Sequence, residues 1–173
     1  MIPFNRLGLP FKLFSRFVYP KNALGDISSL LEEVRSESFV LDIGTGTGVL
    51  TEFAHTIRND LKYVSLDPAY GMIKYAPEYA HRTIALAESL PFEKDTFNIV
   101  LMGDTIHHIG NPRKALQEIK ECMAPSGILF IFDLNPGTFI GSMVCRMERL
   151  LNEPVKSAQP RTLNPVKIEH PIR

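Results

Sequence analysis

A glycine-rich turn between an apolar run and a helical pattern most constrains what this 173-residue chain can fold into. The run Phe39–Ile43 predicts a buried strand, and residues 48–57 carry apolar side chains at helical spacing. Between them stands Gly44-Thr45-Gly46-Thr47-Gly48, whose glycines allow a sharp turn and a close approach of the backbone to a ligand. A turn from strand to helix is where open α/β sheets bind their ligands.

The alternation of strands and helices continues along the chain. Strands that are apolar throughout and separated by helices predict a parallel sheet with both faces covered. We therefore expect an α/β fold, namely a Rossmann-like, doubly wound and mostly parallel sheet of about five strands. The further strands are expected at residues 62–66, 83–86, 97–102 and 128–132, with helices at residues 69–76 and 112–123.

The two ends of the chain differ from this central region. Residues 1–35 are expected to form an N-terminal helical cap, and residues 36–137 the domain that carries the glycine loop. Residues 138–173 are expected to form an amphipathic helix followed by an irregular, proline-rich tail. No run of about 18 apolar residues occurs, so the sequence predicts no membrane span.

Charge and cysteine content exclude some classes of partner. The net charge of zero argues against a nucleic-acid-binding protein. Residues 1–25 hold basic side chains and no acidic one, which fits either peripheral contact with an anionic membrane or a solvated terminus. Cys122 and Cys145 have no metal-binding spacing and are expected to be buried thiols, which fits a cytoplasmic protein.

An acidic residue follows the second expected strand. Asp67 stands 19 residues after Gly48, where a carboxylate can accept hydrogen bonds from both hydroxyls of a ribose. Taken alone, Asp67-Pro68 is also a common way to open a turn. The GxGxG spacing departs from the GxGxxG pattern of pyrophosphate binding, because Val49 occupies the next position. A nicotinamide-dependent oxidoreductase is therefore the less favoured interpretation.

Three ordered motifs between residues 39 and 133 point to one family. The first is LDIGTGTG, residues 41–48, which resembles motif I of class I S-adenosylmethionine-dependent methyltransferases. Residues 87–100 and 116–127 resemble the AExLPFxDxxFDxV and LxEIxRVLxPGG stretches of its methyltransferase type 11 subfamily, typified by ubiquinone- and menaquinone-biosynthesis enzymes. The resemblance implies that residues 36–137 bind S-adenosylmethionine and that the chain is a methyltransferase.

The resemblance also assigns cofactor contacts. The glycine loop would line the methionine part of the cofactor, Asp67 its ribose, and the later residues its adenine. The family usually has an Asp at the position of Leu86, so either Glu88 replaces it or the adenine lacks a polar contact. The implied cofactor-binding residues are Asp42, Gly44, Thr45, Gly46, Asp67, Pro68, Met72, Ala87, Glu88 and Gly103.

The loop after the fourth strand holds the candidate catalytic residues. By resemblance it lies beside the transferred methyl group, so Asp104, His107 or His108 would orient or deprotonate an acceptor. The alternative is that one of the histidines packs locally. Asp133 would either face the acceptor or cap the next turn. No metal is expected, because no third ligand stands at a metal-binding spacing beside the two histidines.

The two chain ends predict the kind of acceptor and whether its pocket is complete. Aromatic and apolar residues at 4–19 and 139–147 predict a small, hydrophobic acceptor, with ordinary core packing as the alternative. The family's sheet has seven strands, and only residues 166–170 offer a strand after the fifth, so its C-terminal edge strands are expected to be missing. An exposed edge predicts a homodimer. The alternative function is a non-catalytic S-adenosylmethionine-binding module that lacks a complete acceptor pocket.

Overall fold

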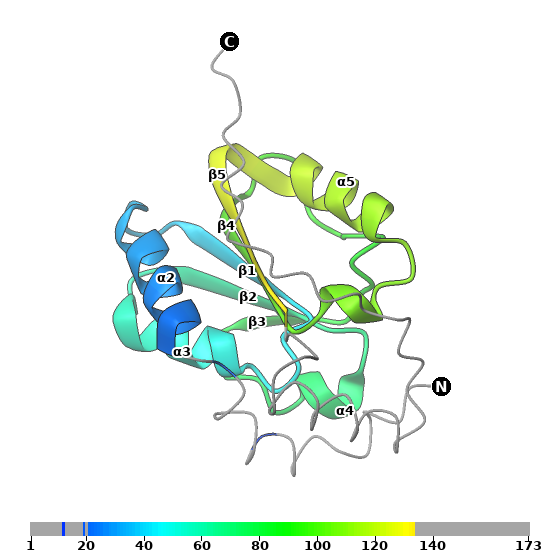
Figure 1. Cartoon of the computed structure of the whole chain (residues 1–173), viewed down its shortest axis with the longest axis horizontal. Helices are drawn as coiled ribbons and strands as arrows, with labels where there is room; N and C mark the ends of the chain where they lie inside the picture. Colours follow the sequence, from blue (N-terminus) through cyan, green and yellow to red (C-terminus); the bar gives the residue numbers. More distant parts are fainter. Residues whose placement is uncertain (1–11, 13–18, 20, 134–173) are drawn as a thin grey trace.

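Five parallel strands form the centre of the structure. The structure, a computed structural model, describes residues 12, 19 and 21–133 (Figure 1). In this part of the chain the strands lie in the order β3-β2-β1-β4-β5, and every neighbouring pair is parallel. The strands are β1 (Phe39–Ile43), β2 (Lys62–Leu66), β3 (His81–Thr83), β4 (Phe97–Gly103) and β5 (Met123–Phe132).

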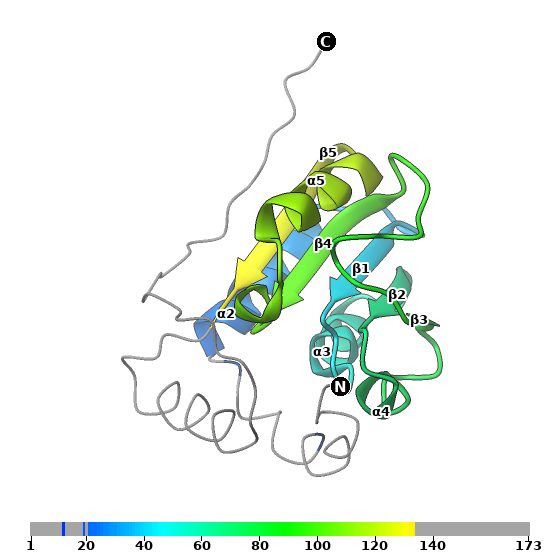
Figure 2. The same cartoon turned by 90° about the vertical axis from the view of Figure 1, so that its right-hand side faces the viewer.

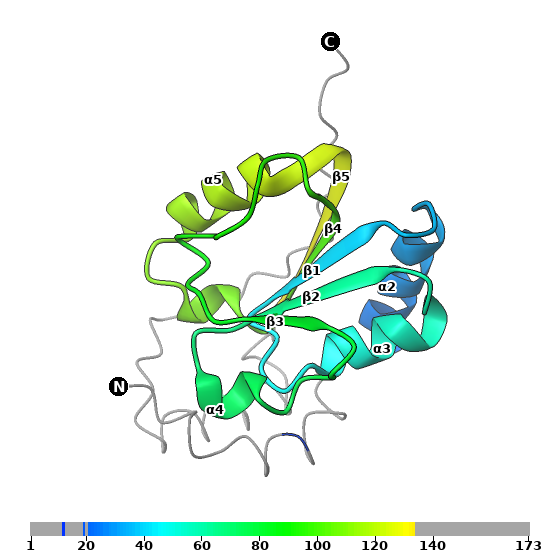
Figure 3. The ribbon, with the colours of Figure 1, turned by 180° about the vertical axis from the view of Figure 1, so that it is seen from behind.

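The direction of the crossovers reverses beside β1. This strand pairs with β2 on one side and with β4 on the other. Figure 2 shows the arrowheads of β1, β4 and β5 pointing to the same side of the molecule, and Figure 3 shows β2 between β1 and β3. In open α/β sheets a ligand binds beyond the carboxyl ends of the strands at such a reversal. The expected Rossmann-like sheet is confirmed, and it places the candidate site at this edge.

Helices cover both faces of the sheet, as Figure 1 shows. In β4, Ile99 and Leu101 join the core beneath α2 and α3, whereas Val100 and Met102 join the core beneath α5. Strand residues alternate between the faces, so a strand covered on both sides is apolar throughout. Within the described residues the helices are α2 (Lys21–Glu32), α3 (Val49–Ile57), α4 (Tyr70–Ile73), the 3-10 turn η3 (Ile106–His108) and α5 (Pro112–Cys122).

The edge strand β3 lies earlier than the expected residues 83–86. Its last residue, Thr83, is opposite Leu66, the last residue of β2, so the partner strand offers no further pairing. The apolar residues that suggested a strand, Ile84 and Leu86, follow it and are 58% and 55% exposed. The expected strand was wrong here because apolar character alone does not show where the neighbouring strand ends.

The other edge strand, β5, begins earlier than the expected residue 128. It follows α5 directly, and Met123 pairs with Phe97. Two residues later on β4, Ile99 pairs with Ile128, so the pairing shifts register between these points. Residues 124–127, which lie between the expected helix and the expected strand, form this irregularity within β5.

The structure describes only part of the two chain ends. Ala23, Ile27 and Leu31 of α2 pack in the same core as α3, so this helix contributes to the domain expected at residues 36–137. The helix expected within residues 138–151 and the strand expected at residues 166–170 lie outside the described residues. In the part that the structure covers, no helix is long and apolar enough to cross a membrane.

Leu101 should be essential for stability because it lies in the middle of the sheet. Its side chain is 0% exposed, and Leu101→Ala should lower the free energy of unfolding by roughly 2–5 kcal/mol through lost burial and the cavity left behind. The matched control is Leu116→Ala on α5, where the leucine is 38% exposed and the change should cost less than about 1 kcal/mol. Urea titration measures both values, and equal losses would contradict this description of the core.

Candidate functional site

The glycine loop turns sharply at the end of β1. Gly44, Gly46 and Gly48 all have positive φ angles, of 68°, 55° and 85°, which favour glycine over other residues. The backbone N–H of Gly44 donates to the carbonyl oxygen of Leu66 at 2.8 Å. A Cβ at Gly44 would also clash with the side chain of Thr105. The loop therefore needs glycine both for its conformation and for its close contact with the segment after β4.

Asp42 stabilises this loop through hydrogen bonds. Its carboxylate is 2% exposed, and its Oδ2 accepts hydrogen bonds from the hydroxyls of Thr45 and Thr51, each at 2.7 Å. Burial raises the pKa of Asp42 to about 6, although both hydroxyls act to lower it. The residue assigned to the opening of motif I thus joins the loop to the first turn of α3.

Asp67 lies at the end of β2 and faces the loop. Its Oδ2 accepts a hydrogen bond from the backbone N–H of Gly46 at 2.9 Å, and its Oδ1 accepts one from Ala69 at 2.8 Å. Burial raises the pKa of this carboxyl, and the two backbone hydrogen bonds act to lower it. An ionised carboxylate has about four acceptor positions, so two backbone donors leave capacity for two hydroxyls. The structure brings together the acid and the turn that the sequence analysis paired.

The residues expected around the adenine are spread over the neighbouring segments. Met72, in α4, and Ala87 are buried, whereas Pro68 is exposed. Glu88 Oε1 accepts a hydrogen bond from the backbone N–H of Asn111 at 3.1 Å. Glu88 therefore supports the loop before α5, a role that sequence reasoning did not give it.

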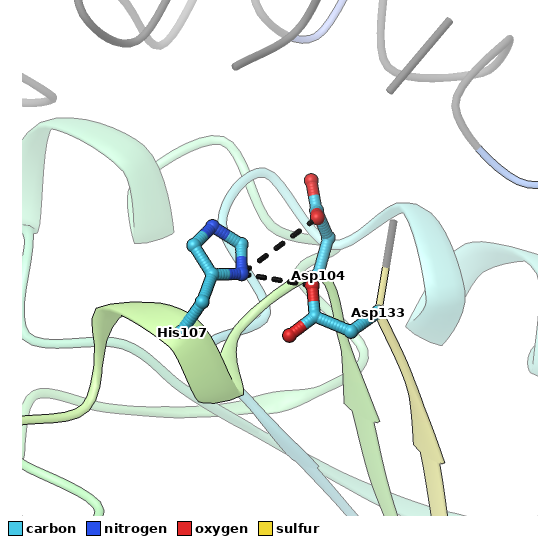
Figure 4. Close-up of side chains that lie close together, drawn as sticks. All are labelled: Asp104, His107 and Asp133. Carbon is cyan, nitrogen blue, oxygen red and sulfur yellow. Dashed lines mark hydrogen bonds and ion pairs between the residues drawn. The ribbon is translucent and has the colours of Figure 1, made fainter. Parts of the chain in front are cut away.

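Beyond β4 and β5, Asp104, His107 and Asp133 form one cluster, which Figure 4 shows. Nδ1 of His107 lies 2.8 Å from Oδ1 of Asp133 and 4.0 Å from Oδ1 of Asp104. The ring of His108 is 3.9 Å from that of His107, and His108 itself is exposed. The spacing in the sequence did not predict that Asp133 would meet His107, because Asp133 follows it by 26 residues.

Tyr19 is a site residue that the sequence analysis included only within the aromatic and apolar residues 4–19. Its hydroxyl donates to the carbonyl oxygen of Gly103 at 3.4 Å, and its ring is 5.9 Å from that of Phe132. Burial raises the pKa of its phenol well above the ordinary value, and Asp42, Asp104 and Asp133 add to the effect, so it stays protonated. The basic N-terminal region contained no signal for this contact.

The sequence and the fold resemble those of known proteins. The model of the methyltransferase domain family matches residues 41–131, which is more than half of the chain. The chain therefore belongs to this family. The matched residues contain the loop, Asp67, Asp104 and His107, and they end just before Asp133.

Two curated proteins illustrate the likeness in sequence. The chain is similar to the biotin biosynthesis bifunctional protein BioHC of Cellvibrio japonicus, with 30% identity over 105 residues that cover 58% of this chain and 20% of that protein. It is also similar to the uncharacterized methyltransferase YcgJ of Bacillus subtilis, with 31% identity over 113 residues that cover 58% of this chain and 42% of that protein. The chain thus spans less than half the length of either relative.

Solved structures show the same fold. The crystal structure of YcgJ from Bacillus subtilis has a TM-score of 0.60 and 26% identity, and it covers 76% of this chain and 59% of that one. A SAM-dependent methyltransferase of Thermotoga maritima has a TM-score of 0.63 and 21% identity, and it covers 88% of this chain and 70% of that one. At such low identity the second likeness concerns the fold alone.

Asp42 should make the stability of the protein depend on pH. Because its pKa of about 6 exceeds the value of about 4 in an unfolded chain, the folded state binds this proton more tightly. The protonated carboxyl of Asp42 stabilises the folded state by roughly 3 kcal/mol. This stabilisation is complete below pH 4 and is lost as pH rises from about 4 to 6. In Asp42→Asn this dependence should be absent.

The measurement is the difference in unfolding free energy between wild type and Asp42→Asn across pH 4 to 7.5. As pH rises to about 6, the unfolding free energy of the wild type should fall relative to that of the variant, and above this pH the difference should stay constant. Taking the difference removes the contributions of the other carboxylates. A difference that is the same at every pH would contradict the assignment.

Proposed function

We propose that this chain binds S-adenosylmethionine at the carboxyl edge of the sheet and transfers its methyl group to a small acceptor. The observation that carries the proposal is the carboxylate of Asp67, which faces the glycine loop and bonds to Gly46 at 2.9 Å. A carboxylate beside a glycine turn at this position of the sheet suits the ribose of a nucleoside. Membership of the methyltransferase domain family supports the same cofactor.

The residues present fit this cofactor. Asp67 retains the acceptor capacity for two ribose hydroxyls while it keeps its two backbone contacts. Gly44 and Gly46 present backbone without a Cβ, and Asp42 fixes the loop through Thr45. When bound, the cofactor supplies a sulfonium-activated methyl group. The protein's task is then to hold the acceptor in line with that group and to exclude water.

The acceptor is proposed to be small and hydrophobic. The proposal rests on the apolar chain ends, of which the structure describes Lys12 and Tyr19. Tyr19 packs against Phe132 beside the cluster of Asp104, His107 and Asp133, so an aromatic ring borders this part of the site. Methylation assays with quinols, phospholipids and small hydrophilic amines test the idea, and turnover of the hydrophilic compounds alone would contradict it.

A second candidate is a cofactor-binding module without turnover. The arrangement at the adenine end favours it: Leu86 is exposed where the family has an acid, and Glu88 is bonded to Asn111. Binding of S-adenosylmethionine without methyl transfer to any acceptor in the assays would favour this module over the enzyme. A cytoplasmic location is part of either proposal, and the buried free thiol of Cys122 is consistent with it.

Removing the carboxylate of Asp67 should weaken cofactor binding. Asp67→Ala should raise the dissociation constant for S-adenosylmethionine roughly 10- to 100-fold, because a hydrogen bond to a charged acceptor contributes about 1.5–3 kcal/mol. Asp26→Ala, on the exposed side of α2, is the matched control and should bind normally. Isothermal titration calorimetry gives the constants and thermal melting confirms folding. Unchanged affinity in a folded Asp67→Ala protein would contradict the proposal.

Restoring the acid that the family carries should strengthen binding. In Leu86→Asp the new carboxylate should accept a hydrogen bond from the adenine amino group and lower the dissociation constant about 5- to 30-fold, the equivalent of 1–2 kcal/mol. Ile84→Asp introduces the same charge at a neighbouring position with similar exposure and should have little effect. Equal effects of the two changes would show that charge alone is responsible and would contradict this placement of the adenine.

A further inference from the structure

The cluster of Asp104, His107 and Asp133 joins the ends of two neighbouring strands. Asp104 follows β4 directly, Asp133 follows β5 directly, and the backbone N–H of Asp104 donates to the carbonyl oxygen of Phe132 at 2.8 Å. The three side chains are only 10–13% exposed. Parallel pairing of β4 with β5 therefore holds a histidine between two carboxylates in a largely dry position.

Asp133 selects one tautomer of His107. Oδ1 of Asp133 lies 2.8 Å from Nδ1 of the ring, and an ionised carboxylate can only accept a hydrogen bond. Nδ1 therefore carries the hydrogen atom and donates a hydrogen bond to Asp133. The neutral ring then has its lone pair on Nε2, which Figure 4 shows on the side of the ring away from both carboxylates. Nε2 is the atom that can take up a proton.

The surroundings favour a positive charge on this ring. Nδ1 is 2.8 Å from Asp133 and 4.0 Å from Asp104, and opposite charges at these distances stabilise an imidazolium. Tyr19 faces the same carboxylates but stays protonated, because burial and these acids raise its pKa. The ring of His108, 3.9 Å away, opposes the charge only when it is itself protonated. The two carboxylates thus stabilise the imidazolium, against the cost of holding a charge in a side chain that is only 10% exposed.

Thr105 ties the turn that carries His107 to the glycine loop. Its hydroxyl lies 2.9 Å from the carbonyl oxygen of Gly103 and 3.3 Å from that of Gly44, and it donates to either one. Its own carbonyl oxygen accepts a hydrogen bond from the backbone N–H of His108 at 3.0 Å. The turn with His107 is thus fixed to the loop that is proposed to hold the methionine part of the cofactor.

We propose that His107 is the general base of methyl transfer, that Asp133 is its positioning residue, and that the acceptor is a compound that loses a proton from a hydroxyl group. This inference rests on the proposed function and narrows its acceptor. The acceptor oxygen forms a bond to the methyl carbon as the bond from that carbon to sulfur breaks, and the electron pair of that bond stays on sulfur. The O–H proton moves to Nε2 of His107, and the imidazolium later releases it to water.

Nuclear magnetic resonance of the imidazole nitrogens tests the interaction between His107 and Asp133 without any acceptor. In the full chain, long-range proton–nitrogen correlations should show His107 as the Nδ1–H tautomer. In Asp133→Asn the tautomers should mix, and the ring should lose its proton at a lower pH because the imidazolium loses the adjacent carboxylate. Asp95→Asn, a change in an exposed turn, should alter neither property. An Nε2–H tautomer in the wild-type protein would overturn the inference.

Kinetics with hydroquinone and catechol as probes test the base. His107→Gln should lower kcat roughly 100- to 10,000-fold, the usual effect of losing a general base. Asp133→Asn should lower kcat about tenfold or more with KM changed less than about threefold, and the acid limb of kcat/KM should move to lower pH. Asp133→Glu should recover part of the rate, and His81→Gln, exposed on β3, should match wild type. An acid limb that does not move in Asp133→Asn would overturn the inference.

The remaining outcomes separate this inference from the proposed function. A wild-type protein that fails to bind S-adenosylmethionine in calorimetry overturns both. A protein that binds it and methylates amines but neither hydroquinone nor catechol overturns the hydroxyl acceptor and leaves the proposed function standing. Loss of activity in EDTA that Mg²⁺ or Mn²⁺ restores also overturns the inference, because the three donor atoms, all within 4.8 Å of one another, would then share a cation rather than position a base.

Discussion

The hydrogen bond from the backbone of Gly46 to Asp67 connects the two parts of the candidate cofactor site. It joins the turn after β1 to the end of β2, strands that lie side by side in the sheet. The bond is possible because parallel pairing brings both carboxyl ends to one edge. It also requires a loop that turns at once after Ile43, which the positive φ angle of Gly44 provides. Every proposed contact with the nucleoside depends on this arrangement.

The same edge brings together the groups proposed to act on the acceptor. Asp104 and Asp133 follow the adjacent strands β4 and β5, and Thr105 contacts the glycine loop. The cofactor loop and the His107 cluster are therefore parts of one sheet edge, and strand pairing and the contact of Thr105 set the distance between them. Such fixed placement is what a reaction that relies on alignment requires.

The fold and the nucleoside end of the site could be predicted because their determinants are local. β1 and β2 begin and end where the apolar runs indicated, at Phe39–Ile43 and Lys62–Leu66. The glycine spacing and Asp67 are visible as a pattern within about 25 residues. A buried parallel strand needs continuous apolar sequence, and a positive φ angle favours glycine, so both leave clear signals.

The acceptor end could not be predicted in the same way because its contacts connect distant residues. Asp133 meets His107 only through the pairing of β4 with β5, and Tyr19 reaches Gly103 from 84 residues away. β3 was misplaced for a related reason, since its end is set by the length of β2. In each case the deciding constraint is the identity of a spatial neighbour, which spacing along the chain does not give.

A crystal structure of the full chain with S-adenosylhomocysteine tests the central claim most directly. The account predicts both ribose hydroxyls within hydrogen-bond distance of the Asp67 carboxylate, and the amino acid part of the ligand against the backbone of Gly44 and Gly46. A nucleoside bound elsewhere, or an Asp67 side chain without ribose contact, would contradict it.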